Sequence, residues 1–90
     1  MFEWDERKAA QNLAKHGVAF DAVERFDFEA VWEMADDRFD YGERRILAVA
    51  PLDGRLHALI YTRRGNAIRV ISLRAASRRE SRKYAEQIQT

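Results

Sequence analysis

The sequence predicts an α+β fold with two N-terminal helices, a four-stranded antiparallel sheet and a C-terminal helix. Apolar residues recur every three or four positions up to Phe26, alternate with polar ones from Phe28, and give way to a helix-capping signal at Ser77. Ninety residues, 47% of them hydrophobic, suffice for one core and not for two. We therefore expect a single domain over residues 1–90.

The first helix is predicted to begin after Asp5, which can cap it, and to run through about His16. Gly17 follows as a typical C-terminal stop. Apolar residues pair at i,i+4 spacing along this helix, Ala9 with Leu13 and Ala10 with Ala14. A second, short helix is expected over Asp21–Phe26, where apolar side chains recur every third residue, at Phe20, Val23 and Phe26.

Four strands are predicted because the period changes to alternation at Phe28. Their expected ranges are Phe28–Met34, which ends at the Asp36-Asp37 turn, then Arg45–Ala50, Arg55–Thr62 and Ala67–Leu73. Asp53-Gly54 favours a tight hairpin turn between the second and third strands, and Arg64-Gly65-Asn66 marks the next turn. The fourth strand is largely apolar on both faces, which predicts a central position in the sheet.

The C-terminal helix is predicted from a capping box at Ser77-Arg78-Arg79-Glu80. In this motif the Ser77 hydroxyl bonds the amide three residues on, and the Glu80 carboxylate bonds back to the Ser77 amide. The helix that follows contains Tyr84 and Ile88.

Composition and motifs exclude several classes of protein. The chain has no cysteine and two histidines, the N-terminus is acidic where a signal peptide is basic, and no apolar run has the roughly 18 residues of a membrane span. We expect a cytoplasmic protein without membrane contact. Asp36-Asp37 lacks the spacing of a calcium loop, and nucleotide-binding and acyl-transfer motifs are missing, so we expect neither a metal nor a cofactor.

Charge is strongly polarised along the chain. Residues 1–62 hold 8 Lys and Arg against 13 Asp and Glu, whereas residues 63–90 hold 8 against 2. Seven of the eight late cations are arginine, whose planar donor fork suits phosphate. A polyanion is the first partner to consider, although arginine is also an ordinary solubilising residue.

Arg74 is the most informative of these arginines, because it lies between the last strand and the capped helix. There its guanidinium and the helix N-terminal amides can converge on one anion. Arg64 and Arg45 join this phosphate site if the sheet brings the strand ends together. The competing interpretation is that Arg45 and Arg74 pair with carboxylates such as Glu43 or Glu80.

Three further side chains admit two interpretations each. Tyr84 lies two helical turns after Ser77 and is either a core residue or a phenol that stacks on a base or transfers a proton. His16 is either a helix C-terminal cap or a proton shuttle. His57 alternates with apolar neighbours and is interpreted as structural.

Several stretches across almost the whole chain resemble the BrnT toxins, which are small RelE-like ribonucleases of bacterial type II toxin-antitoxin modules. They are Phe2-Glu3-Trp4-Asp5, Asn12 with Lys15-His16-Gly17-Val18, Tyr41-Gly42-Glu43 with Arg45, Tyr61-Thr62 with Arg64-Gly65, and Ile71-Ser72 with Arg74, Ala76, Glu80 and Tyr84. The resemblance implies a RelE-like domain that cleaves RNA without a metal. It also implies a BrnA-type antitoxin, which neutralises the toxin as a hetero-oligomer and alone contacts DNA.

On this resemblance, Arg74 and Arg45, joined by Arg64, would hold the RNA phosphate. His16, Glu43 and Tyr84 compete as general base on the ribose 2′-hydroxyl and general acid at the 5′-oxygen. Two other interpretations remain open: a catalytically inactive module that binds its partner or nucleic acid, and a non-catalytic RNA chaperone.

Overall fold

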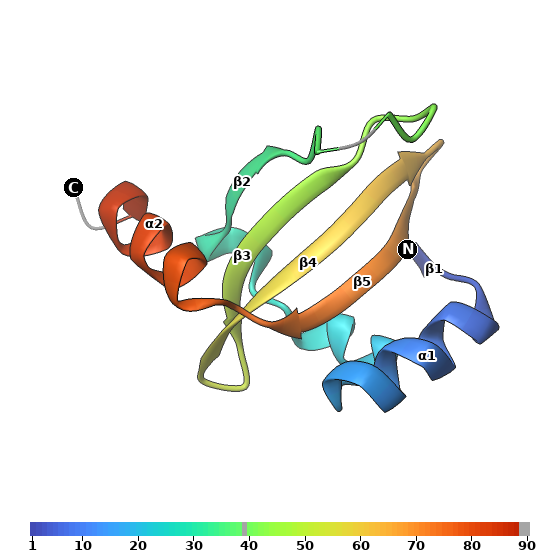
Figure 1. The fold of residues 1–90 in the computed structure, drawn as a ribbon, viewed down its shortest axis with the longest axis horizontal. Coiled ribbons are helices and arrows are strands. Elements are labelled where there is room, and N and C mark those ends of the chain that lie inside the picture. Colours follow the sequence, from blue (N-terminus) through green and yellow to red (C-terminus); the bar gives the residue numbers. More distant parts are fainter. Residues whose placement is uncertain (39, 89–90) are drawn as a thin grey trace.

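The computed structural model describes residues 1–38 and 40–88, which form a five-stranded sheet with helices at its two ends (Figure 1). The strands are β1 (Phe2–Glu3), β2 (Trp32–Ala35), β3 (Ile46–Leu52), β4 (Arg55–Arg64) and β5 (Ala67–Ala75). The helices are α1 (Glu6–His16) and α2 (Arg78–Ile88), and the 3-10 turns are η1 (Phe20–Arg25) and η2 (Phe28–Ala30). The predicted α+β class is confirmed.

The prediction of four strands, all antiparallel, is wrong at one edge of the sheet. Phe2 and Glu3 form a fifth strand that runs parallel to β5, opposite Ile68 and Arg69. The Ile68 N–H donates to the Met1 carbonyl oxygen at 2.9 Å, and Arg69 pairs with Glu3 at 2.9 Å. Two residues are too few to show the alternation from which strands are predicted, so no sequence pattern indicated this strand.

The other strands pair antiparallel in the order β5-β4-β3-β2. Asp53 and Gly54 have φ angles of 52° and 83° and form the predicted hairpin turn between β3 and β4. In the order β1-β5-β4-β3-β2 the central strand is β4, and not β5 as predicted. On its outer side β5 pairs only with the two residues of β1. The apolar character of β5 reflects its burial under α1 and η1 rather than a central place in the sheet.

Both capped helices form as predicted. Asp5 accepts hydrogen bonds from the amides of Arg7 and Lys8, and Gly17, at φ 73°, ends α1. At the start of α2, the Glu80 amide donates to the Ser77 hydroxyl at 3.1 Å and the Ser77 amide donates to the Glu80 carboxylate at 2.8 Å.

The segment between α1 and β2 differs from the prediction. The expected helix over Asp21–Phe26 is the 3-10 turn η1, and the expected start of the first strand at Phe28 is η2, so that β2 begins only at Trp32. Three-residue spacing matches the 3.0 residues per turn of a 3-10 helix better than the 3.6 of an α-helix. The Asp27 side chain accepts from the Glu29 amide and stabilises η2 in place of a strand.

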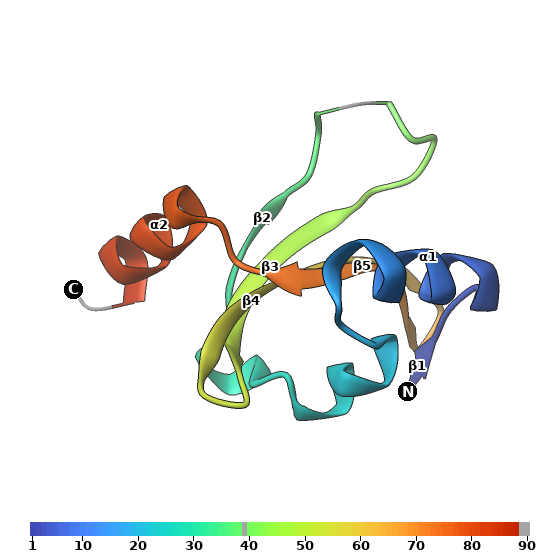
Figure 2. The same cartoon turned by 60° about the horizontal axis from the view of Figure 1, so that its bottom comes forward.

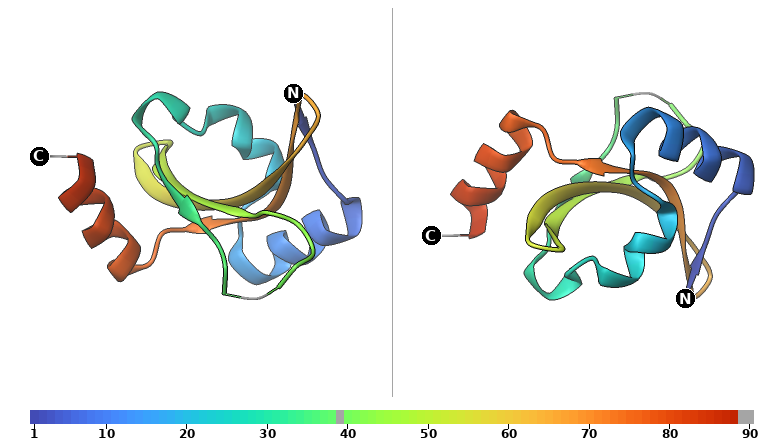
Figure 3. Two further views of the ribbon diagram at one scale, coloured as in Figure 1. Left: turned by 90° about the horizontal axis from the view of Figure 1, so that it is seen from above. Right: turned by 90° about the horizontal axis from the view of Figure 1, so that it is seen from below.

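The two faces of the sheet are covered unequally. Figure 3 shows η1 and η2 on one face, and α1 and α2 on the other. The core lies on the η1 face, where Phe20 and Val23 pack against Leu59, Tyr61 and Leu73. On the other face α1 and α2 stand at opposite ends of the sheet, as Figure 2 also shows. The surface between them, which we call the open face, carries the site described next.

Candidate functional site

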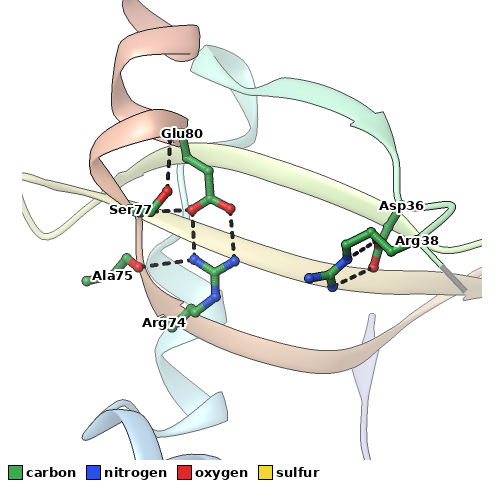
Figure 4. A network of polar contacts seen from close by, with 6 residues as sticks. All are labelled: Asp36, Arg38, Arg74, Ala75, Ser77 and Glu80. Atoms are coloured by element: carbon green, nitrogen blue, oxygen red, sulfur yellow. Dashed lines mark hydrogen bonds and ion pairs between the residues drawn. The ribbon is translucent and has the colours of Figure 1, made fainter.

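The anion site predicted at Arg74 and the start of α2 is occupied by a carboxylate of the chain itself. Glu80 accepts from Arg74 Nη1 at 2.7 Å and from Nη2 at 2.9 Å, and also from the Ser77 amide (Figure 4). The Glu80 side chain is only 16% exposed. Hydrogen bonds from Arg74 lower the pKa of Glu80 to about 2, so both groups are charged at neutral pH.

Arg74 keeps one edge of its guanidinium available. Glu80 takes the end edge, Nη1 and Nη2, and the Ala75 carbonyl oxygen lies 3.4 Å from Nη1. Among the described residues no acceptor bonds Nε or the second N–H of Nη2, which together form the side edge of the fork. In Figure 4 this side edge faces Arg38. Glu80 therefore fixes the orientation of Arg74 without using all of its donors.

Arg38, which lies opposite Arg74 in Figure 4, is held by a carboxylate in a similar way. Its Nε and Nη2 donate to the two carboxylate oxygens of Asp36 at 2.8 and 3.2 Å, and the Asp36 side chain is only 4% exposed. Its Nη1 points toward Arg74 (Figure 4). Two guanidinium groups, one paired with the buried Asp36 and the other with the half-buried Glu80, thus face one another. We call Arg38, Arg74, Asp36 and Glu80 the arginine clamp.

The clamp borders a cavity of about 300 Å³ on the open face. The cavity is lined by Lys15, His16, Asp36, Arg38, Tyr41, Arg45, Ile60, Ile71, Ser72 and Arg74. Three of the six predicted site residues, His16, Arg45 and Arg74, therefore meet in one place. Four lysine and arginine side chains face a single carboxylate in this lining, so the cavity attracts anions.

His16 reaches the cavity because α1 is fastened to β5. The Asn12 side chain accepts from the Leu73 amide at 3.2 Å and donates to the Leu73 carbonyl oxygen at 2.7 Å, which places the last turn of α1 beside Ser72. Burial, and then the charges of Lys15 and Arg74, lower the pKa of His16 below its ordinary 6.5. The imidazole is therefore neutral at pH 7 and can accept a proton.

Arg45, Glu43 and Arg64 form a neighbouring cluster. Arg45 Nε donates to Glu43 at 3.3 Å and its guanidinium stacks 3.8 Å above the Tyr41 ring, while Arg64 lies 3.8 Å from the other Glu43 oxygen. Glu43, Arg45 and Arg64 line a second cavity of about 150 Å³. Arg45 borders both cavities, whereas Glu43 and Arg64 do not line the one that holds His16.

Tyr84 lies apart from the clamp. Its hydroxyl donates to the Ala30 carbonyl oxygen at 2.7 Å and ties α2 to η2. The spacing from Ser77 does place it on α2, but this tertiary contact turns the phenol away from the cavity that holds Arg74. His57 lies in β4, where its Nδ1 is 2.9 Å from the Arg55 carbonyl oxygen.

Sequence reasoning missed Arg38 and Lys15 as members of the site. Lys15 and Tyr41 lie within the stretches that resemble the BrnT toxins, which is a signal for them. Arg38 follows two aspartates in a polar turn and carries no such signal. Its pair with Asp36, directly after β2, brings it opposite Arg74.

A comparison with protein families identifies the chain. Residues 4–80 match the model of the BrnT ribonuclease toxin of type II toxin-antitoxin systems. The chain belongs to the BrnT family. The matched range contains every residue of the arginine clamp and most of the fold, from the Asp5 cap to the start of α2.

Membership in the BrnT family identifies the chain as a type II toxin of the ribonuclease class, with RNA as its target and a protein antitoxin as its partner. None of the curated proteins matches the chain. Over residues 1–38 and 40–88, neither α-helix has the length and apolar character needed to cross a membrane. In the same residues no three His, Asp or Glu side chains gather as metal ligands do, and metal independence stays a prediction.

Proposed function

We propose that this BrnT protein cleaves RNA in the cavity beside the arginine clamp, without a metal, using the ribose 2′-hydroxyl as nucleophile. The observation that carries the proposal is the pair of guanidinium groups of Arg74 and Arg38, which face one another and line the same cavity. A scissile phosphate between them would be bound from two sides. Charge that develops on its oxygens in the transition state would be stabilised by donors already held in place.

His16 is our choice as general base, since among the three predicted candidates it alone lines this cavity, and its lowered pKa keeps it neutral. It takes the proton of the 2′-hydroxyl as the 2′-oxygen forms a bond to phosphorus and the bond to the 5′-oxygen breaks. The leaving 5′-oxygen receives a proton from Lys15, which lines the same cavity. The products carry a 2′,3′-cyclic phosphate and a 5′-hydroxyl. Glu43 and Tyr84 remain the alternative acid and base.

The test is cleavage of end-labelled RNA by the purified chain in EDTA. We expect cutting to persist in EDTA and to stop when the nucleotide at the cut site is 2′-deoxy. His16→Ala should lower the single-turnover rate about 10²–10⁴-fold, whereas Glu43→Gln and Tyr84→Phe should lower it far less. Circular dichroism of each variant checks the fold. Cutting of the deoxy substrate, or its arrest by EDTA, contradicts the mechanism.

The pH dependence gives an independent check on His16. A base with a lowered pKa is active when deprotonated, so the rate should be constant around pH 7 and fall below the lowered pKa. His16→Gln should remove this acidic limb and leave the shape of the remaining profile unchanged. A rate that rises as pH falls would assign another group.

We further propose that the antitoxin is of the BrnA type, and that DNA is contacted only through it. The family supports a protein antitoxin, and the resemblance of the chain to BrnT supports the type. If the adjacent reading frame encodes a small ribbon-helix-helix protein, its co-expression should restore growth that this chain alone arrests. Harmless expression of the chain alone would favour an inactive binding module.

A further inference from the structure

A groove between α2 and the β2–β3 hairpin is the feature that the proposed function does not use. It has a volume of about 350 Å³. Trp32 and Met34 of β2 and Leu47 of β3 form its floor, and Arg79, Lys83 and Gln87 of α2 form its wall. Met34 pairs with Leu47 across the strands and is 48% exposed. An aromatic and aliphatic floor of this kind lies open on the surface.

The groove is continuous with the arginine clamp. A smaller cavity of about 150 Å³ shares Met34, Leu47 and Glu80 with the groove. The same small cavity shares Asp36, Arg38 and Arg74 with the His16 cavity. A chain bound at the clamp can therefore extend along the open face from α1 toward α2.

The wall of the groove carries positive charge that no described residue neutralises through an ion pair. Arg79 and Lys83 are four residues apart on α2, on the same side of the helix, and both are exposed. Within residues 1–38 and 40–88 neither has an ion-pair partner. The one carboxylate that borders the groove, Glu80, is held by Arg74 and Ser77.

From this arrangement we infer that the groove binds a nucleobase of single-stranded RNA, adjacent to the phosphate held by the arginine clamp. The base would stack on Trp32 with Met34 and Leu47 around it, and the next phosphate would lie against Arg79 and Lys83. Single-stranded RNA is bound in this manner, by an aromatic platform beside a cationic track. An acidic amphipathic helix also suits an apolar floor with a cationic wall. Continuity with the clamp favours RNA, since one polymer then fills both sites.

This inference rests on the proposed function, because it assigns a subsite to the same substrate. The chain offers a direct probe, since Trp4 and Trp32 are its two tryptophans. In a Trp4→Phe variant, Trp32 is the only tryptophan, so the tryptophan fluorescence comes from the groove alone. We expect a 2′-O-methyl oligoribonucleotide, which has no free 2′-hydroxyl to attack, to quench Trp32 emission in a saturable manner. The matched Trp32→Phe variant, in which Trp4 reports, should show little quenching.

A mutant cycle locates the base. Trp32→Ala should weaken binding of the oligonucleotide about tenfold or more, and an abasic substitution at one position should weaken binding to the unmodified protein by a similar factor. Trp32→Ala and the abasic substitution together should weaken binding no more than either change alone. Trp32→Leu, which keeps an apolar floor, provides a second variant if the alanine variant fails to fold.

The outcomes separate the two proposals. If RNA is cut in EDTA and binds, yet Trp32 emission does not change and no abasic position couples to Trp32, the base subsite is wrong while the proposed function stands. If the antitoxin quenches Trp32 and RNA does not, the groove belongs to the protein partner and the inference is likewise overturned. If RNA neither binds nor is cut, both proposals fail.

Discussion

The two faces of the sheet are built from the same strands and differ in what they bury. On the η1 face, Leu59, Tyr61 and Leu73 are completely inaccessible to solvent. On the open face, their neighbours Ile60 and Arg74 border cavities. Because successive residues of a strand point to opposite faces, one stretch of β4 and β5 can stabilise the fold and present charged groups at the same time.

On the open face, arginines are oriented without a large core around them. Each arginine of the clamp is fixed by a carboxylate, Arg74 by Glu80 and Arg38 by Asp36, and both carboxylates are far less exposed than the average surface group. An arginine–carboxylate pair with two parallel hydrogen bonds fixes the orientation of the guanidinium as well as its distance. The open face is thus ordered by ion pairs where the η1 face is ordered by packing.

The largest effect that we expect comes from the open face. Arg74→Ala should lower the single-turnover rate of RNA cleavage about 10²–10³-fold, because it removes charge stabilisation of the transition state. Arg25→Ala is the matched control, since Arg25 also makes a two-contact pair, with Asp53, at an exposed turn away from the site. Equal losses of rate in both variants would show that Arg74 has no special role.

A substitution on the η1 face should act on stability instead. Leu59→Ala should lower the free energy of unfolding by about 2–5 kcal/mol, the cost of a cavity in a packed core. Urea unfolding followed by circular dichroism measures it. The cleavage rate per folded molecule should stay close to that of the unmodified protein. A variant that keeps full stability would place Leu59 outside the core.

The Glu80 carboxylate of the open face contributes to the pH dependence of stability. Its pKa in the folded chain is about 2, below its ordinary value of 4.5, chiefly because of Arg74. A lowered carboxyl pKa stabilises the fold above pH 4.5, and this contribution is lost as pH falls toward 2. Glu80→Gln should therefore lower the free energy of unfolding by roughly 2 kcal/mol at pH 7 and by much less near pH 2. A difference that does not change with pH would contradict this role.

The smallest expected effect is on the salt dependence of RNA binding. Arg74→Ala and Arg38→Ala should each reduce the slope of log affinity against log salt concentration by about 0.7, the value for one phosphate contact on a single strand. Fluorescence anisotropy at several salt concentrations, with an oligonucleotide that resists cleavage, gives the slope. Arg25→Ala should leave it unchanged. An unchanged slope in Arg74→Ala would make that residue purely structural.

The parts of the fold that could be predicted depend on local sequence motifs. The Asp5 and Ser77 caps and the Asp53-Gly54 turn each depend on a few consecutive residues, and all three form. Contacts between distant residues were not predictable in this way. β1 exists because Phe2 reaches Ile68, and the phenol of Tyr84 bonds the carbonyl oxygen of Ala30, 54 positions earlier.

The site shows the same division. Arg74 can be predicted as a site residue because it precedes a capping box, which is a local motif. The carboxylate that fills its end edge was foreseen only as a competing interpretation, since sequence does not tell whether Glu80 or a ligand takes the donors. Arg38 could not be predicted because the turn that contains it has no regular pattern, and its place opposite Arg74 depends on its pair with Asp36.

The side-chain amide of Asn12 positions α1, and it also bonds to the outer edge of β5. Past Arg69, no strand among residues 1–38 and 40–88 pairs with the outer side of β5, and such an edge is a template on which a second molecule can add. Asn12 offers Leu73 one acceptor and one donor, the same pair that a strand residue would offer. Asn12 therefore occupies the backbone groups of Leu73 to which a further strand would bond. Asn12→Ala should expose these groups, and we expect the variant to self-associate at concentrations where the unmodified chain stays monomeric.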